Sequence, residues 1–354
     1  MSTTQHNTLR SSNFELLRIV SMFIIVTFHF AFHGGFSFGS NVTIPKLWIQ
    51  FIQVGGRIGV NVFVLMSGYF LINAPKISVS KILRLWLQTF FYSVVIYLVL
   101  VFSGIRPFST NEFIEMLSPI THNVWWFAST YFVLYFLSPY LNILLKNLDR
   151  ETYLKLLFLL FVMWCLIPTF TTSDFQSNNL LWFMFLYSLA GYIKLWHDKS
   201  MFSCWVYHVI ATVLVLFTAF VLGTRYYKKQ KLPVLLVSVA MFLGFKGLKI
   251  KQNKFINIVA TATFGVYLIH DNDYVREFLW INVFKNATYS DTIKIIPYSC
   301  AVITLVYVGC TLIELLRLKI IEPLYLPIIK KADIVWDRML EAVKSKMSKM
   351  SKKN

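Results

Sequence analysis

Ten apolar runs, each close to the length of a membrane-spanning helix, follow one another along this chain. A helix needs about 20 mostly apolar residues to cross the hydrocarbon core of a bilayer. Helices also satisfy their own backbone polar groups, which lipid cannot do. The runs therefore predict an all-α polytopic membrane protein, with about ten transmembrane helices in one bundle. They cover residues 14–33, 47–72, 82–103, 124–144, 153–171, 179–196, 202–222, 232–247, 255–271 and 295–316.

The composition agrees with a membrane bundle. Hydrophobic residues make up 57% of the chain and charged residues 14%, whereas a soluble domain carries about 25% charged residues. This balance excludes a soluble enzyme, a disordered chain and a soluble nucleic-acid-binding protein, although the net charge is +18. The four cysteines lie in or beside apolar runs without a zinc-binding spacing. We expect them to be packing residues without disulfides.

Basic residues between the runs predict the orientation in the membrane. With the N-terminus inside, most lysines and arginines fall in inner loops, as the positive-inside rule requires. The loop at 223–231 is then external and breaks the rule with four basic residues. If the eighth run did not span, the strongly basic C-terminus would lie outside, which fits worse. We expect a multi-pass plasma-membrane protein with both termini cytoplasmic, and a first run retained as a signal-anchor helix.

The segment 328–354 has a pattern of its own. Apolar side chains recur at helical spacing with lysines between them. This is typical of a basic amphipathic helix on an anionic membrane surface, and a solvated tail with a chance pattern is the alternative. We therefore divide the chain into a transmembrane domain, 1–327, and a cytoplasmic tail, 328–354.

Two ionisable residues of the first run share one helix face. Arg18 and His29 are 11 positions apart, which is about three turns of 3.6 residues. Ionisable side chains inside a span are costly and indicate function. Taken singly, Arg18 is explained as a basic residue at the inner end of the span whose side chain snorkels to the interface, and His29 as a hydrogen-bonded interior histidine. Together on one stripe, they predict a single cavity that runs through the bundle.

The second run combines small residues with a cation. Gly56, Gly59 and Gly68 would allow close helix packing. Arg57 lies among them and needs a partner or an aqueous cavity, unless it snorkels.

These two runs resemble the acyltransferase-3 family of integral membrane O-acyltransferases, which includes bacterial surface-polysaccharide O-acetyltransferases. Further matching segments follow in the family's order, and Asn61 is a departure at a position that is usually apolar. The matches are R-x10-H (Arg18 to His29), G-R-x-G-V-x-x-F-x-x-x-S-G-Y (Gly56 to Tyr69), Lys81-x-x-Arg84, the aromatic run from Trp125 to Pro139, and F-G-V-Y-L-I-H (Phe264 to His270).

The resemblance implies an acyltransferase of the O-acetyltransferase kind, that is, an enzyme that transfers acyl groups other than aminoacyl groups. It would move an acyl group, commonly acetyl, from cytoplasmic acyl-CoA to a hydroxyl of a cell-surface or lipid-linked glycan. Acyl-CoA would be a co-substrate, with no bound cofactor. His29 fits the general base, because a sugar hydroxyl is a poor nucleophile and neutral imidazole is the usual base near pH 7. His270 would orient the acceptor, act as a second acid or base, or cap its helix.

The candidate residues fall into three groups. Lys81 and Arg84 could equally be topology flanks, and the tryptophans could belong to an interfacial aromatic belt. The catalytic candidates are His29, Arg18 and His270; the donor-binding candidates are Arg18, Lys81 and Arg84; the acceptor-binding candidates are Arg57, Trp125 and Trp126.

A metal site and other partners receive less support. His33 lies one turn beyond His29, but no acidic or cysteine third ligand is evident, so we expect no metal. Glu314 and Arg317 are placed to form an ion pair. The expected partners are acyl-CoA, the glycan and the bilayer, without nucleic acid, and the sequence predicts no particular oligomeric state.

Two other functions remain as alternatives. A transporter or flippase of lipid-linked sugars would show inverted repeats, with helices broken at matching positions of two halves. A glycan polymerase would have a large outer loop with several arginines. The sequence shows neither pattern.

Overall fold

The computed structural model describes residues 11–351 apart from 75, 172, 200, 224, 225 and 229. Helices dominate these residues, and no strand occurs among them. The α-helices are α1 (Ser12–Phe32), α2 (Ile44–Gln53), α3 (Gly55–Leu71), α4 (Val79–Phe102), α5 (Thr110–Leu117), α6 (Trp126–Lys146), α7 (Arg150–Phe161), α8 (Ile167–Phe170), α9 (Asn179–Trp196), α10 (Cys204–Phe217), α11 (Leu232–Gly247), α12 (Lys254–Thr261), α13 (Thr263–His270), α14 (Asp273–Glu277), α15 (Ile295–Ile320) and α16 (Glu322–Ser351). π-helical turns cover Val162–Leu166, Thr218–Leu222 and Phe278–Val283, and a 3-10 helix covers Asn286–Tyr289.

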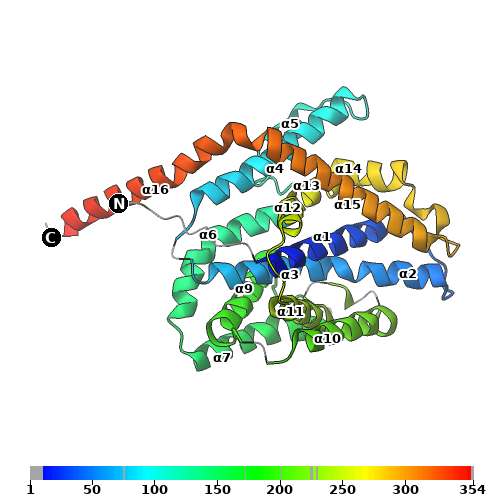
Figure 1. Ribbon diagram of the computed structural model, residues 1–354, viewed down its shortest axis with the longest axis horizontal. Helices are drawn as coiled ribbons and strands as arrows, with labels where there is room; N and C mark the ends of the chain where they lie inside the picture. Colours follow the sequence, from blue (N-terminus) through cyan, green and yellow to red (C-terminus); the bar gives the residue numbers. More distant parts are fainter. Residues whose placement is uncertain are drawn as a thin grey trace.

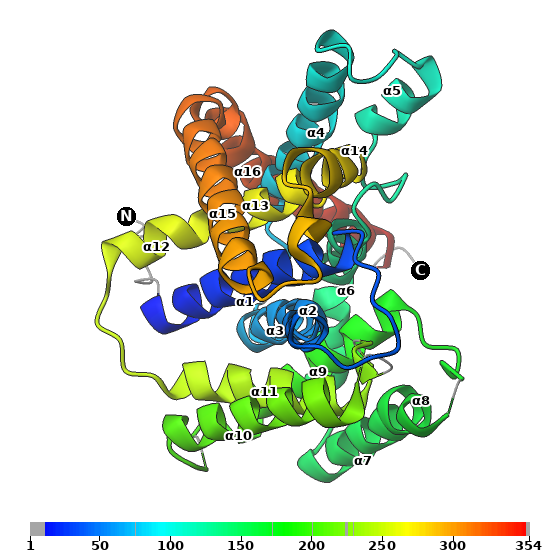
Figure 2. The same cartoon turned by 90° about the vertical axis from the view of Figure 1, so that its right-hand side faces the viewer.

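The first helix lies at the centre of the bundle. α1 packs against α2, α3, α11, α12, α13 and α15. Figure 2 shows α1 in dark blue between α15 on one side and α3 on the other, with α10 and α11 farther out. The helix that carries Arg18 and His29 is therefore enclosed by protein along most of its length, which allows polar groups to be shielded from lipid.

The membrane-spanning pattern is confirmed in part. All ten apolar runs are helical, and seven helical stretches are long and apolar enough to cross a bilayer within the described residues. The runs at 179–196, 232–247 and 255–271 are shorter or more polar. The count of ten spans stays a prediction, as does the external loop at 223–231, of which residues 224, 225 and 229 lie outside the described residues.

Glycines bring α1 and α3 into close contact. A Cβ atom on Gly56 would lie 2.2 Å from Cγ of Phe28, and one on Gly59 would lie 2.5 Å from the carbonyl oxygen of Ser21. Only a residue without a side chain fits at such distances. The small residues of the second apolar run are thus explained by helix packing.

Asn61, the departure from the family pattern, joins three helices. Its side chain is fully buried on α3, accepts a 2.9 Å hydrogen bond from Nε1 of Trp182 on α9, and donates one of 3.3 Å to Oγ of Ser238 on α11. Both functions of the amide are satisfied, so the polar residue is accommodated without a buried unpaired group.

The C-terminal helix α16 begins at Glu322, before the predicted boundary at 328, and runs along α4 before it extends away from the bundle (Figure 1). Asp333 anchors it: its carboxylate accepts hydrogen bonds from the backbone N–H of Ser80 at 3.0 Å and from the Ser80 hydroxyl at 2.5 Å. The tail is therefore attached to the beginning of α4. Its position on a membrane surface stays a prediction.

Candidate active site

Two cavities with arginine side chains in their lining adjoin the central helix α1. The first, which we call the His29 cavity, has a volume of about 250 Å³ near the C-terminal end of α1. Its polar lining comes from His29, His33, Arg57, Asp271 and Arg276, and the rest is mainly aliphatic and aromatic. A small set of polar groups in an apolar concavity is the usual composition of a ligand site.

His270 fixes the orientation of His29. Nδ1 of His270 lies 2.5 Å from the carbonyl oxygen of Val266, which can only accept, so this nitrogen carries a proton. Nε2 of neutral His270 then accepts the 2.8 Å hydrogen bond from Nδ1 of His29. The lone pair of His29 is therefore on Nε2. His270 is fully buried behind His29 and does not line the cavity, so it could influence a ligand there only through His29.

Asp271 faces the free nitrogen of His29. Its Oδ1 lies 3.5 Å from Nε2 of His29 and 3.7 Å from Nη1 of Arg276, and it has no hydrogen-bond partner. A carboxylate here can stabilise an imidazolium on His29. The sequence analysis missed Asp271 and Arg276, although Asp271 directly follows His270.

The structure supplies the acidic group that the sequence did not reveal beside His29 and His33. One ligand atom from each of His29, His33 and Asp271 lies within 4.8 Å of the others. A divalent cation would approach the guanidiniums of Arg57 and Arg276, which line the same cavity and repel it. The sequence-based reason for expecting no metal is therefore incomplete, and the absence of a metal stays a prediction.

Two of the three acceptor-binding candidates line the His29 cavity. The guanidinium of Arg57 lies 5.8 Å from the ring centre of Phe28 and 5.4 Å from that of Trp126, within the range of cation–π interactions. Arg57 and Trp126 both line the His29 cavity. Trp125 does not: it precedes the first turn of α6 with an extended backbone, is 1% exposed and packs in the core.

The second cavity, which we call the Arg18 cavity, has a volume of about 270 Å³ near the N-terminal end of α1. It brings together the donor-binding candidates Arg18, Lys81 and Arg84, from α1 and α4. Ser67, Gln88 and Tyr131 add neutral polar groups. Three cations at one cavity suit a ligand with several negative charges.

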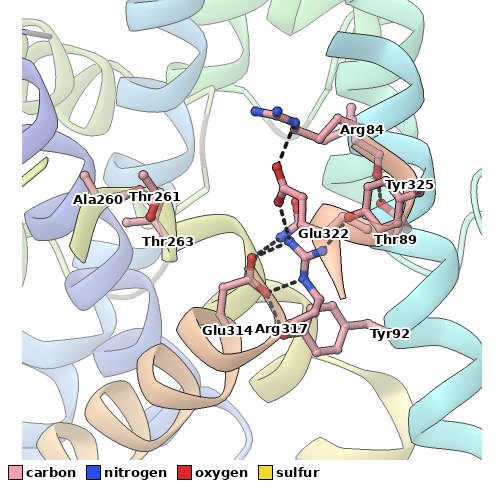
Figure 3. Close-up of polar contacts among 12 residues, drawn as sticks. Arg84, Thr89, Tyr92, Ala260, Thr261, Thr263, Glu314, Arg317, Glu322 and Tyr325 are labelled. Carbon is pink, nitrogen blue, oxygen red and sulfur yellow. Dashed lines mark hydrogen bonds and ion pairs between the residues drawn. The ribbon is translucent and has the colours of Figure 1, made fainter. Parts of the chain in front are cut away.

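A buried ionic network holds one side of this cavity. Figure 3 shows Arg84 paired with Glu322, Glu322 with Arg317, and Arg317 with Glu314. Nε and Nη2 of Arg317 donate to the two carboxylate oxygens of Glu314 at 2.9 and 2.8 Å, so the predicted ion pair is confirmed. Gln88 and Tyr92 of α4 also donate to Glu314, at 2.9 and 2.6 Å. The network thus connects α15 and α16 to the wall of the Arg18 cavity.

Instead of the predicted single cavity, there are two cavities that share a wall. Among the described residues, three line both cavities: Phe63 of α3, Phe127 of α6 and Phe264 of α13. The expectation of one cavity was wrong because it used the face of α1 alone, and these phenylalanines come from other helices.

Together, the fold and the cavities define a helical membrane protein with a histidine–carboxylate site beside a cation-lined pocket. A family model described as an acyltransferase domain matches residues 11–315. The chain belongs to the acyltransferase-3 family, and the matched region contains every candidate residue that the sequence analysis named. Neither the curated proteins nor the solved structures provide a match.

Proposed function

We propose that this membrane acyltransferase moves an acetyl group from cytoplasmic acetyl-CoA to a hydroxyl of a cell-surface or lipid-linked glycan. The observation that carries the proposal is the free Nε2 of His29, which faces a cavity next to one lined by three cations. The protein would lie in the plasma membrane with both termini cytoplasmic. The tail from 328 would lie on the inner surface, where anionic lipid attracts its lysines.

The reaction uses His29 as the general base. Nε2 of His29 takes the proton of the acceptor hydroxyl while the oxygen attacks the thioester carbonyl carbon. A C–O bond forms, the C–S bond breaks, and the proton passes from His29 to the departing thiolate, which leaves an ester and free CoA. Asp271 stabilises the imidazolium between these steps, and His270 keeps Nε2 turned toward the cavity.

The two substrates approach from different cavities. Arg18, Lys81 and Arg84 bind the phosphates of CoA, where the fork of an arginine suits oxyanions. Arg57 and Trp126 contact the glycan in the His29 cavity, with the indole ring available for stacking on a sugar.

The direct test is acyl transfer itself. Membrane vesicles that contain the protein are given radiolabelled acetyl-CoA, and label in the glycan fraction is compared with that of vesicles from cells without the protein. We expect label only where the protein is present, with a matching mass increase of the surface polysaccharide. Equal labelling in both samples would contradict an acyltransferase function for this glycan class and favour a transporter or polymerase.

The cation-lined cavity makes a separate prediction about the donor. Arg18→Ala should raise the KM for acetyl-CoA by about tenfold or more, since a hydrogen bond to a charged group contributes about 1.5–3 kcal/mol. Lys81→Ala and Arg84→Ala should have smaller effects. Arg84 lies 3.1 Å from its partner Glu322, whereas the pair between Arg18 and Glu15 is longer, at 3.9 Å, and leaves Arg18 more available to the donor. The measurement is the initial rate against donor concentration. An unchanged KM and rate for Arg18→Ala would make Arg18 a flank of the span only.

A further inference from the structure

The wall between the two cavities consists of three aromatic side chains and lies between the proposed donor site and His29. A general base must lie within about 3.2 Å of the proton that it removes. The acceptor hydroxyl, and with it the acyl carbon, must therefore reach the His29 cavity. Arg18 and His29 are 11 residues apart along α1, which is roughly 16 Å at 1.5 Å per residue. A donor held at Arg18 must reach past this wall.

The wall is apolar and built from separate helices. Phe127 lies at its centre, with ring centres 6.3 Å from Phe63 and 5.8 Å from Tyr267, and Phe264 lies 6.2 Å from Tyr267. Phe63, Phe127 and Phe264 are each only partly buried, because both cavities border them. An apolar wall favours the hydrocarbon end of a donor over its charged phosphates, which would stay with Arg18, Lys81 and Arg84.

We propose that Phe63, Phe127 and Phe264 form an aromatic constriction through which the acyl end of the donor passes to His29, and that its width restricts the donor to short acyl groups. This inference rests on the proposed acyltransferase function. The constriction also keeps water of the Arg18 cavity from the reacting thioester, which limits hydrolysis.

Widening the constriction should change acyl-chain selectivity. In Phe264→Ala and Phe63→Ala, the rate with hexanoyl-CoA relative to acetyl-CoA should rise by at least about tenfold, since even one methylene changes discrimination by 10–200-fold in a fitted site. Phe264→Leu should give a smaller change in the same direction and serves where the alanine variant folds poorly. Phe264→Trp should lower acetyl transfer, because the larger ring narrows the constriction.

Phe132→Ala is the matched control, because Phe132 is on α6 like Phe127 but packs against Phe136 and lines neither cavity. An unchanged chain-length ratio in active Phe63→Ala and Phe264→Leu proteins would overturn the constriction and leave the acyltransferase function intact. If the wild-type protein transferred no acyl group from any acyl-CoA, the proposed function and the constriction would both be wrong.

Discussion

Replacing His29 with glutamine should abolish detectable acyl transfer, with a loss in kcat of about 10²–10⁴-fold. Glutamine can keep a hydrogen bond to Nε2 of His270 through its amide N–H, but it offers no basic nitrogen to the His29 cavity. The variant should therefore insert and fold normally, since the buried His270 retains a partner. The measurement is acetyl transfer to the glycan at matched protein levels.

A second histidine provides the control for this experiment. His208 on α10 can be replaced with glutamine in the same way. Nδ1 of His208 hydrogen-bonds to the carbonyl oxygen of Cys204, and its ring lines neither the His29 cavity nor the Arg18 cavity. His208→Gln should retain the wild-type rate. Wild-type activity in His29→Gln would show that His29 is not the general base, and the reaction that we propose would lose its chemical basis.

Helical periodicity explains how much of this site the sequence predicts. Arg18 and His29 share a face of one helix, so their placement on the same side of α1 follows from their spacing, although the division of that side into two cavities does not. Lys81 and Arg84 are three positions apart, and residues i and i+3 are neighbours on a helix, so their common cavity also agrees with their spacing. The cost of ionisable groups in lipid indicated which of these residues to consider.

Contacts between distant segments explain what the sequence does not predict. Asp271 is the last residue of the run at 255–271 and Arg276 lies beyond it, and the packing of α13 on α1 brings them to His29. Trp125 and Trp126 are the same residue type at adjacent positions, so the sequence does not show which of them faces the cavity. The phenylalanine wall consists of residues that any apolar span contains, so no pattern distinguishes them from core residues.

Loss of Glu314 should destabilise the protein more than loss of any exposed charge. Among the described residues, Glu314→Ala would leave Glu322, at 3.4 Å, as the remaining acidic partner of the buried Arg317 guanidinium. Gln88 and Tyr92 would lose their acceptor as well. Breaking a buried ion pair by removing one partner costs about 3–5 kcal/mol. The free energy of unfolding, measured by denaturant titration in detergent micelles, should fall by about this amount.

The exposed pair of Glu151 and Lys155 is the internal control for this measurement. Both side chains are more than 70% exposed, at 74% and 73%, and Glu151→Ala should change the free energy of unfolding by at most about 1 kcal/mol. The double variant Glu314→Leu/Arg317→Met should lose less stability than Glu314→Ala, because no unpaired charge stays buried. Equal losses for Glu314→Ala and Glu151→Ala would show that the network does not stabilise the packing of α15 and α16 against α4. Because Glu322 also pairs with Arg84, a loosened network should raise the KM for the acyl donor along with the loss of stability.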